Sequence, residues 1–117
     1  MAARDHFRAL ARHRLRLPAT LTALETGSRQ ELRLVDLGLG GACVELTGPD
    51  QVLGRGVVVR LEVRSPNLWD PLALLARVAW SRPPVRDDLA RMGLEFEPAS
   101  GPALRALVEL LSASGYE

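Results

Sequence analysis

The sequence predicts an all-β protein, a six-stranded antiparallel β-barrel with one C-terminal helix. Six short segments alternate apolar and polar residues with the period of two that is typical of a half-buried strand. No helical pattern separates these segments, so the crossover connections that parallel strands require are missing and the strands are expected to be antiparallel. A short chain of this kind avoids exposed sheet edges by closing the sheet, and the helix is expected to cover one end.

The six predicted strands follow one another along most of the chain. They are Leu15–Leu24, Gln30–Val35, Ala42–Leu46, Val57–Val63, Leu72–Ser81 and Arg91–Glu97. The alternation is most regular in Val57–Val63, where every second residue is valine or leucine. In the fifth segment the same rule places Val78 and Trp80 together on one face. Pro18 assigns the beginning of the first segment to a sheet edge.

The chain is expected to end in an amphipathic helix from about Gly101 to Ser114. Ser100 is suited to the N-cap and Pro102 to the first turn. The apolar residues that repeat at i, i+3, i+4 and i+7 predict the face that packs on the barrel. They are Leu104, Leu107, Val108 and Leu111.

The composition excludes several classes of protein. A chain of 117 residues is one domain with a modest core, and a net charge of +1 argues against a general binder of polyanions. The single cysteine, Cys43, excludes an internal disulfide and is expected to be a small buried or half-buried apolar residue. No catalytic set, metal-ligand cluster or cofactor motif emerges, so we do not expect an enzyme. No signal peptide or membrane span is recognisable, which predicts a cytoplasmic protein.

Basic residues gather at the N-terminus. Five of the 15 basic residues, all of which are arginines, lie within the first sixteen positions. We expect residues 1–14 to form a flexible basic arm and residues 15–117 to form the domain. A GC-rich genome would account for the absence of lysine, so a single arginine is a weak signal by itself.

A glycine-rich corner joins the second and third predicted strands. Asp36 is followed by Gly38, Gly40 and Gly41. Glycine permits positive φ and lets a ligand approach the main chain, and successive N–H groups at such a turn can bind an anion. The same pattern is also typical of an ordinary tight turn.

The arm and the corner together resemble the PilZ domain, a family of bacterial receptors for cyclic di-GMP. The R-x-x-x-R motif of that family appears as Arg12 to Arg16, followed by Leu17-Pro18, and its [D/N]-x-S-x-x-G motif appears as Asp36 to Gly41. The stretches Val78-Ala79-Trp80 and Met92-Gly93-Leu94-Glu95-Phe96 are similar to later strands of the family. The resemblance covers nearly the whole chain, and the order of the motifs makes it fairly specific.

The resemblance implies a site for cyclic di-GMP. It would be formed by Arg12, Arg16, Asp36, Gly38, Gly40 and Gly41. Arginine binds phosphate in bidentate fashion and stacks on bases, and a carboxylate accepts hydrogen bonds from a guanine edge. Gly38 departs from the motif, which has serine here. The missing hydrogen bond is worth about 0.5–1.5 kcal/mol, or about 1.5–3 kcal/mol with a charged partner.

Three functions remain open on the sequence. The first is a receptor in which cyclic di-GMP orders the arm on the barrel and an unidentified partner protein reads the change. The second is an interaction adaptor that no longer binds nucleotide, with Trp69 as a contact or as a lid on the barrel. The third, a nucleic-acid-binding barrel, is weak because aromatic residues make up only 4% of the chain. None of the three requires a membrane.

Overall fold

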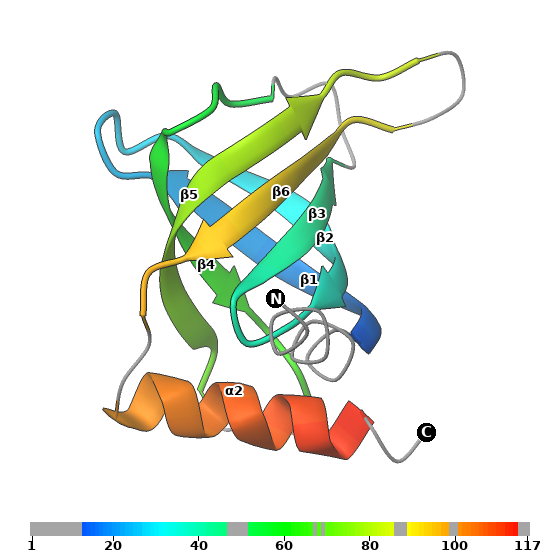
Figure 1. Ribbon diagram of the computed structural model, residues 1–117, viewed down its shortest axis with the longest axis vertical. Coiled ribbons are helices and arrows are strands. Elements are labelled where there is room, and N and C mark those ends of the chain that lie inside the picture. Colours follow the sequence, from blue (N-terminus) through cyan, green and yellow to red (C-terminus); the bar gives the residue numbers. More distant parts are fainter. Residues whose placement is uncertain are drawn as a thin grey trace, which may run out of the picture.

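The protein is a closed antiparallel β-barrel with one helix across an end (Figure 1). The computed structural model describes residues 13–46, 52–66, 68, 70–85, 89–98 and 101–114. The strands close in the order β1-β2-β3-β6-β5-β4, and every neighbouring pair is antiparallel. The predicted fold class is therefore confirmed. The elements are β1 (His13–Ala23), β2 (Arg29–Leu37), β3 (Gly41–Leu46), β4 (Val58–Val63), β5 (Leu72–Arg82), β6 (Arg91–Phe96) and α2 (Gly101–Ser114).

Two strands extend at one end by two residues more than the alternation pattern predicted. β1 begins at His13 instead of Leu15, and β2 continues to Leu37 instead of ending at Val35. The two extensions pair with each other, since His13 lies opposite Leu37. Backbone hydrogen bonding continues wherever a partner strand is present, whereas a sequence pattern shows only the stretch in which side chains alternate.

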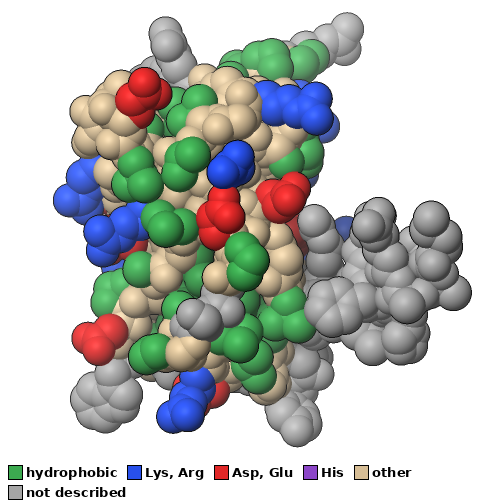
Figure 2. All heavy atoms as spheres, turned by 60° about the vertical axis from the view of Figure 1, so that its left-hand side comes forward, with side chains coloured by type: hydrophobic (Ala, Val, Ile, Leu, Met, Phe, Trp, Pro, Cys, Tyr) green, Lys and Arg blue, Asp and Glu red, His purple; other side chains and the backbone are tan. Residues whose placement is uncertain are grey.

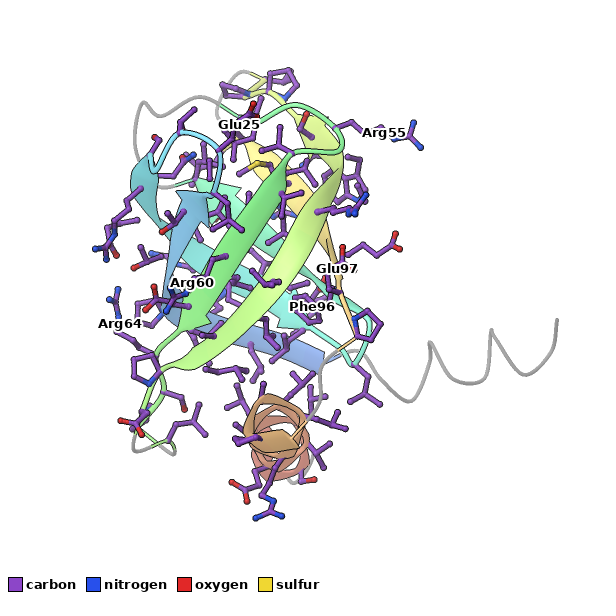
Figure 3. All side chains as sticks on the ribbon, turned by 90° about the vertical axis from the view of Figure 1, so that its left-hand side faces the viewer. Glu25, Arg55, Arg60, Arg64, Phe96 and Glu97 are labelled. Atoms are coloured by element: carbon purple, nitrogen blue, oxygen red, sulfur yellow. The ribbon has the colours of Figure 1, made fainter. Side chains whose placement is uncertain are left out.

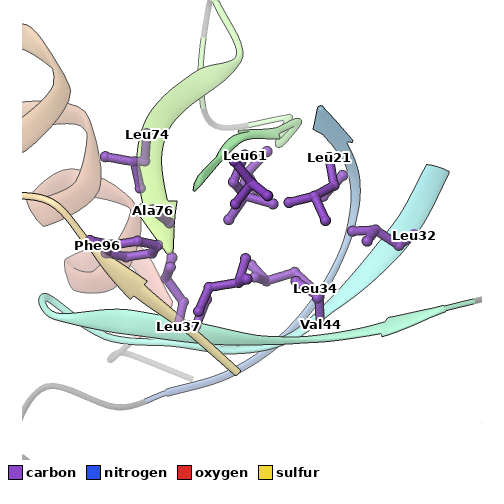
Figure 4. Close-up of a cluster of buried hydrophobic side chains, with 14 of the residues drawn as sticks. Leu21, Leu32, Leu34, Leu37, Val44, Leu61, Leu74, Ala76 and Phe96 are labelled. Carbon is purple, nitrogen blue, oxygen red and sulfur yellow. The ribbon is translucent and has the colours of Figure 1, made fainter. Parts of the chain in front are cut away.

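Aliphatic side chains from all six strands fill the barrel (Figure 4). Leucines at the centre, such as Leu21, Leu34 and Leu61, are completely buried. Because strand residues alternate between the two sides of the sheet, the polar residues between them lie on the outer surface. The interior of this barrel is a packed core. The two cavities described in the next section are both lined in part by outward-facing residues of β5 and β6.

The helix α2 covers the barrel with a face different from the one predicted. Leu107, Leu110 and Leu111 are buried, whereas Leu104 and Val108 are 41% and 45% exposed. The prediction was therefore wrong for two of its four residues. In a helix this rich in apolar residues, two overlapping faces fit the same spacing, and the barrel selects the face on which Ala103 and Ala106 allow close approach. No helix among the described residues is long and apolar enough to cross a membrane.

Two leucines of α2 provide a matched test of this orientation. Leu107→Ala is expected to lower the free energy of unfolding by about 2–5 kcal/mol, because it leaves a cavity between the helix and the barrel. Leu104→Ala removes the same atoms from an exposed position and should change stability by only about 0.5 kcal/mol. Urea unfolding of both variants measures the difference, and equal losses would contradict the observed orientation.

An ion pair on the outer surface gives a test of pH dependence. Arg64 Nη2 lies 2.8 Å from Glu31 Oε2, and the Thr20 hydroxyl donates to Glu31 Oε1 at 3.1 Å. The hydrogen bond from Arg64, and then that from Thr20, lowers the pKa of Glu31 below its ordinary value. Since the pKa is lower in the folded state, the pair stabilises the protein above the unfolded-state pKa and is lost as pH falls through the folded-state pKa. Arg64→Ala should raise the Glu31 pKa in an NMR titration, whereas Arg60→Ala should leave it unchanged.

Candidate functional site

A β-bulge in β2 determines the direction of Asp36. Leu34 lies opposite Val44, but Asp36 lies opposite Cys43, so Val35 is an extra residue in this strand. Regular alternation would place Asp36 on the inner face with Leu34. The extra residue reverses the alternation, so that Asp36 is turned outward and is half-buried, while Leu37 is completely buried.

A second bulge determines the position of Trp80. In the pairing of β5 with β6, Val78 lies opposite Leu94 and Trp80 lies opposite Gly93, so Ala79 is the extra residue. The prediction that Trp80 shares a face with Val78 was therefore wrong, because Val78 is buried whereas Trp80 turns to the outer surface and is 46% exposed. Its indole lies over Gly93, where an added Cβ would overlap the ring.

The two bulges align five side-chain positions across the outer surface. Arg14 is opposite Asp36, Asp36 opposite Cys43, Cys43 opposite Gly93, and Gly93 opposite Trp80. Directly opposed residues of antiparallel strands lie on the same face of the sheet. We call these five positions the site row. It begins with an arginine on β1 and an aspartate on β2, and it ends at an indole on β5. Cys43 is buried within it, as predicted.

The glycine corner next to the site row is a tight turn with close packing. The Gly38 N–H donates to the Gly41 carbonyl at 2.8 Å, and the Gly40 carbonyl accepts from the Phe96 N–H at 2.9 Å. An added Cβ on Gly41 would overlap the carbonyl oxygen of Leu94, so this position requires glycine. The glycines of this corner were expected to permit a positive φ angle. Gly38, Gly40 and Gly41 do not adopt one, and positive φ occurs at other glycines of the chain.

A cavity of about 240 Å³ opens beside the corner and the site row. Its walls come from the corner, from β3, and from the outer faces of β5 and β6. Trp80 contributes an aromatic surface of the kind on which nucleobases stack. The lining residues are Gly40, Gly41, Ala42, Cys43, Ala79, Trp80, Gly93, Leu94 and Glu95.

A second cavity of about 480 Å³ adjoins the first, since both include Ala79 and Glu95. Arg55 and Arg77 line it, and Arg77 Nε lies 2.8 Å from Glu97 Oε1. Figure 3 shows Arg55 and Glu97 projecting from the same side of the barrel. Within the described part of the chain, no group of three His, Cys, Asp or Glu side chains could hold a metal ion.

The structure describes five of the six predicted ligand residues. Arg16 is exposed on β1, and the three glycines lie together in the turn that follows Asp36. Arg12, like Trp69, lies outside the described residues, so its position relative to Asp36 stays a prediction.

Sequence reasoning missed three positions of the site row. Arg14 lies directly opposite Asp36, while Trp80 and Gly93 form the other end of the row. The local signals were a third arginine inside the R-x-x-x-R motif and a glycine inside a strand, which often marks a close approach. The bulges at Val35 and Ala79 have no clear signal in the sequence.

The sequence was also compared with known protein families. The family model of the PilZ domain matches residues 3–113. The chain belongs to the PilZ family. The family predicted from the two motifs is therefore confirmed. PilZ domains are non-enzymatic receptors for cyclic di-GMP. A search of curated proteins finds no match.

Several solved structures have the same fold. The PilZ domain of YcgR from Escherichia coli, solved with c-di-GMP, has a TM-score of 0.67 and 20% identity, and the match covers 87% of this chain and 89% of that one. A PilZ domain of a cellulose-synthesising bacterium has a TM-score of 0.65 and 17% identity, with 87% and 95% covered. The Bacillus subtilis inhibitor of motility, MotI/DgrA, has a TM-score of 0.72 and 18% identity. This match covers 91% of the present PilZ chain but only 50% of the Bacillus protein.

Proposed function

We propose that this PilZ protein is a cytoplasmic receptor for cyclic di-GMP that signals through a partner protein. The ligand would be bound by Arg12, Arg16, Asp36, Gly38, Gly40 and Gly41, and it would order the N-terminal arginine arm on the barrel. The observation that carries the proposal is the conjunction of family membership with the site row, where Asp36 is turned outward beside the glycine corner. The YcgR domain solved with c-di-GMP supports the ligand class.

The chemistry of the site row fits a molecule with two guanines and two phosphates. Asp36 would accept hydrogen bonds from the edge of one guanine, and the arm arginines would bind phosphate through their planar forks. Asp36 and Trp80 are separated by three strand spacings, or about 14 Å along the curved surface. We propose that the second guanine reaches toward the indole of Trp80.

Titration calorimetry tests the receptor function directly. We expect the purified protein to bind cyclic di-GMP, and we expect duplex DNA of random sequence to produce no comparable heat. DNA binding without nucleotide binding would favour the small nucleic-acid-binding barrel instead.

Trp80 provides a test of the ligand position. Trp80→Ala should weaken binding of cyclic di-GMP by about 1–3 kcal/mol, the value of one base–aromatic stack. Gly93→Ala keeps the indole but displaces it, because the new Cβ would occupy the space of the ring. In a Trp69→Phe background, ligand-induced quenching of Trp80 fluorescence should accompany binding. Unchanged affinity in both variants would show that the ligand does not reach β5.

One observation favours a second function, an adaptor that keeps the PilZ fold without binding nucleotide. Gly38 replaces the motif serine and so removes one hydroxyl from the predicted site. The adaptor hypothesis predicts no heat in the cyclic di-GMP titration, even at high ligand concentration, for a protein whose circular dichroism shows the folded barrel.

A further inference from the structure

A second row of outward-facing residues crosses the same strands next to the site row. Arg33 on β2 is opposite Glu45 on β3, Glu45 is opposite Arg91 on β6, and Arg91 is opposite Arg82 on β5. Glu45, Arg91 and Arg82 each lie two positions along their strand from a member of the site row. Arg33 lies three positions from Asp36, because the bulge in β2 adds one residue. We call these four residues the basic row.

The basic row has more positive charge than its own carboxylate can neutralise. Arg91 lies 3.1 Å from Glu45 Oε2, and the Glu45 side chain is only 14% exposed, so that carboxylate is occupied. The side chains of Arg33 and Arg82 are exposed and form no ion pair or hydrogen bond with the described residues. Arg82 also lies directly opposite Arg91, and like charges in this relation destabilise a sheet.

Three other arginines on the outer surface of the barrel do have acidic partners. Arg64 pairs with Glu31 at 2.8 Å, Arg77 pairs with Glu97 at 2.8 Å, and Arg60 approaches Glu62 at 3.8 Å. Figure 2 shows one side of the molecule on which basic and acidic side chains are interspersed among apolar ones. Arg33 and Arg82 differ from these three arginines because no acidic partner among the described residues neutralises them.

We propose that the basic row docks an acidic segment of a partner protein. Arg33 and Arg82 are three strand spacings apart, about 14 Å, which is the reach of about four residues of extended chain. Carboxylates about four residues apart would thus meet both unpaired guanidinium groups and relieve the repulsion between Arg82 and Arg91. Arginine and tryptophan are enriched at protein interface hot spots, and exposed Trp80 precedes Arg82 by two residues on the same face.

A protein segment fits this row better than a nucleic acid does. Glu45 lies within the row and would repel a continuous phosphate backbone, and the net charge of the chain is only +1. Docking at the basic row does not require bound nucleotide, so this inference stands apart from the proposed function.

The test uses the full-length protein and a short fluorescein-labelled peptide of alternating glutamate and serine. Fluorescence anisotropy should show binding at low ionic strength that weakens as salt is added. The double variant Arg33→Glu/Arg82→Glu should lower the affinity at least tenfold. The double variant Arg60→Glu/Arg64→Glu, which has the same change in net charge on the other face, should bind the peptide much more tightly than the first. A peptide of alternating glutamine and serine should not bind.

Four outcomes would overturn the proposal. These are no binding of the acidic peptide at low salt, equal losses in the two double variants, tighter binding of a single-stranded DNA oligomer than of the peptide, and loss of cyclic di-GMP affinity in Arg33→Glu/Arg82→Glu. The last would assign the basic row to the nucleotide site. Circular dichroism confirms that each variant is folded before it is compared. A wild-type protein that binds the peptide but not cyclic di-GMP would refute the receptor function and leave the docking surface intact.

Discussion

Replacing either motif arginine, as Arg12→Ala or Arg16→Ala, is expected to abolish or strongly weaken binding of cyclic di-GMP. Each guanidinium would donate charge-assisted hydrogen bonds to the ligand, worth about 1.5–3 kcal/mol apiece. The loss of one such bond raises Kd about ten- to a hundredfold, and the loss of a bidentate pair raises it further. Arg16 is exposed on β1, so its replacement should leave the barrel intact.

Arg4→Ala is the control for this prediction. It removes the same charge from the same basic segment but lies outside the R-x-x-x-R motif, so binding should be nearly unchanged. Calorimetry of the three variants at one ionic strength makes the comparison. Equal losses in all three would show a diffuse electrostatic effect instead of a defined site.

Gly38→Ser is expected to tighten cyclic di-GMP binding by about one to two decades, because it restores the motif hydroxyl. The φ angle of Gly38 is not positive, so a side chain at this position avoids the cost of the left-handed region. Gly38 is buried in the turn and its N–H is bonded to Gly41, so the backbone is already fixed for the new side chain. Gly38→Ala adds the Cβ without the hydroxyl and separates the steric effect from the hydrogen bond.

Asp36→Ala distinguishes the two proposed functions further. In the receptor it removes the acceptor for the guanine edge and should cancel the gain of Gly38→Ser while leaving the arginines in place. If the wild type does not bind and Gly38→Ser does not restore binding, the adaptor function becomes the better explanation. A pull-down that compares wild type with Trp69→Ala is then the next measurement.

The sequence by itself determined the fold class and the family. Alternating residues such as those of Val57–Val63 specify which side of a strand is buried, and the missing helical crossovers exclude a parallel sheet. The motif residues are close together in the chain, so their order and spacing could be recognised without a structure. The site residues themselves stay predictions, since binding has yet to be measured.

Only the tertiary structure decided which side chains reach the outer surface near the glycine corner. Alternation predicts the direction of a side chain only while each residue has one partner residue on the neighbouring strand. The extra residues Val35 and Ala79 break this pairing and reverse the alternation. These reversals turn Asp36 and Trp80 outward. The face of α2 was likewise selected by contact with the barrel, which buries Leu107 and leaves Leu104 exposed. Bulge positions and packing faces depend on partners distant in sequence, and a local pattern contains no information about those partners.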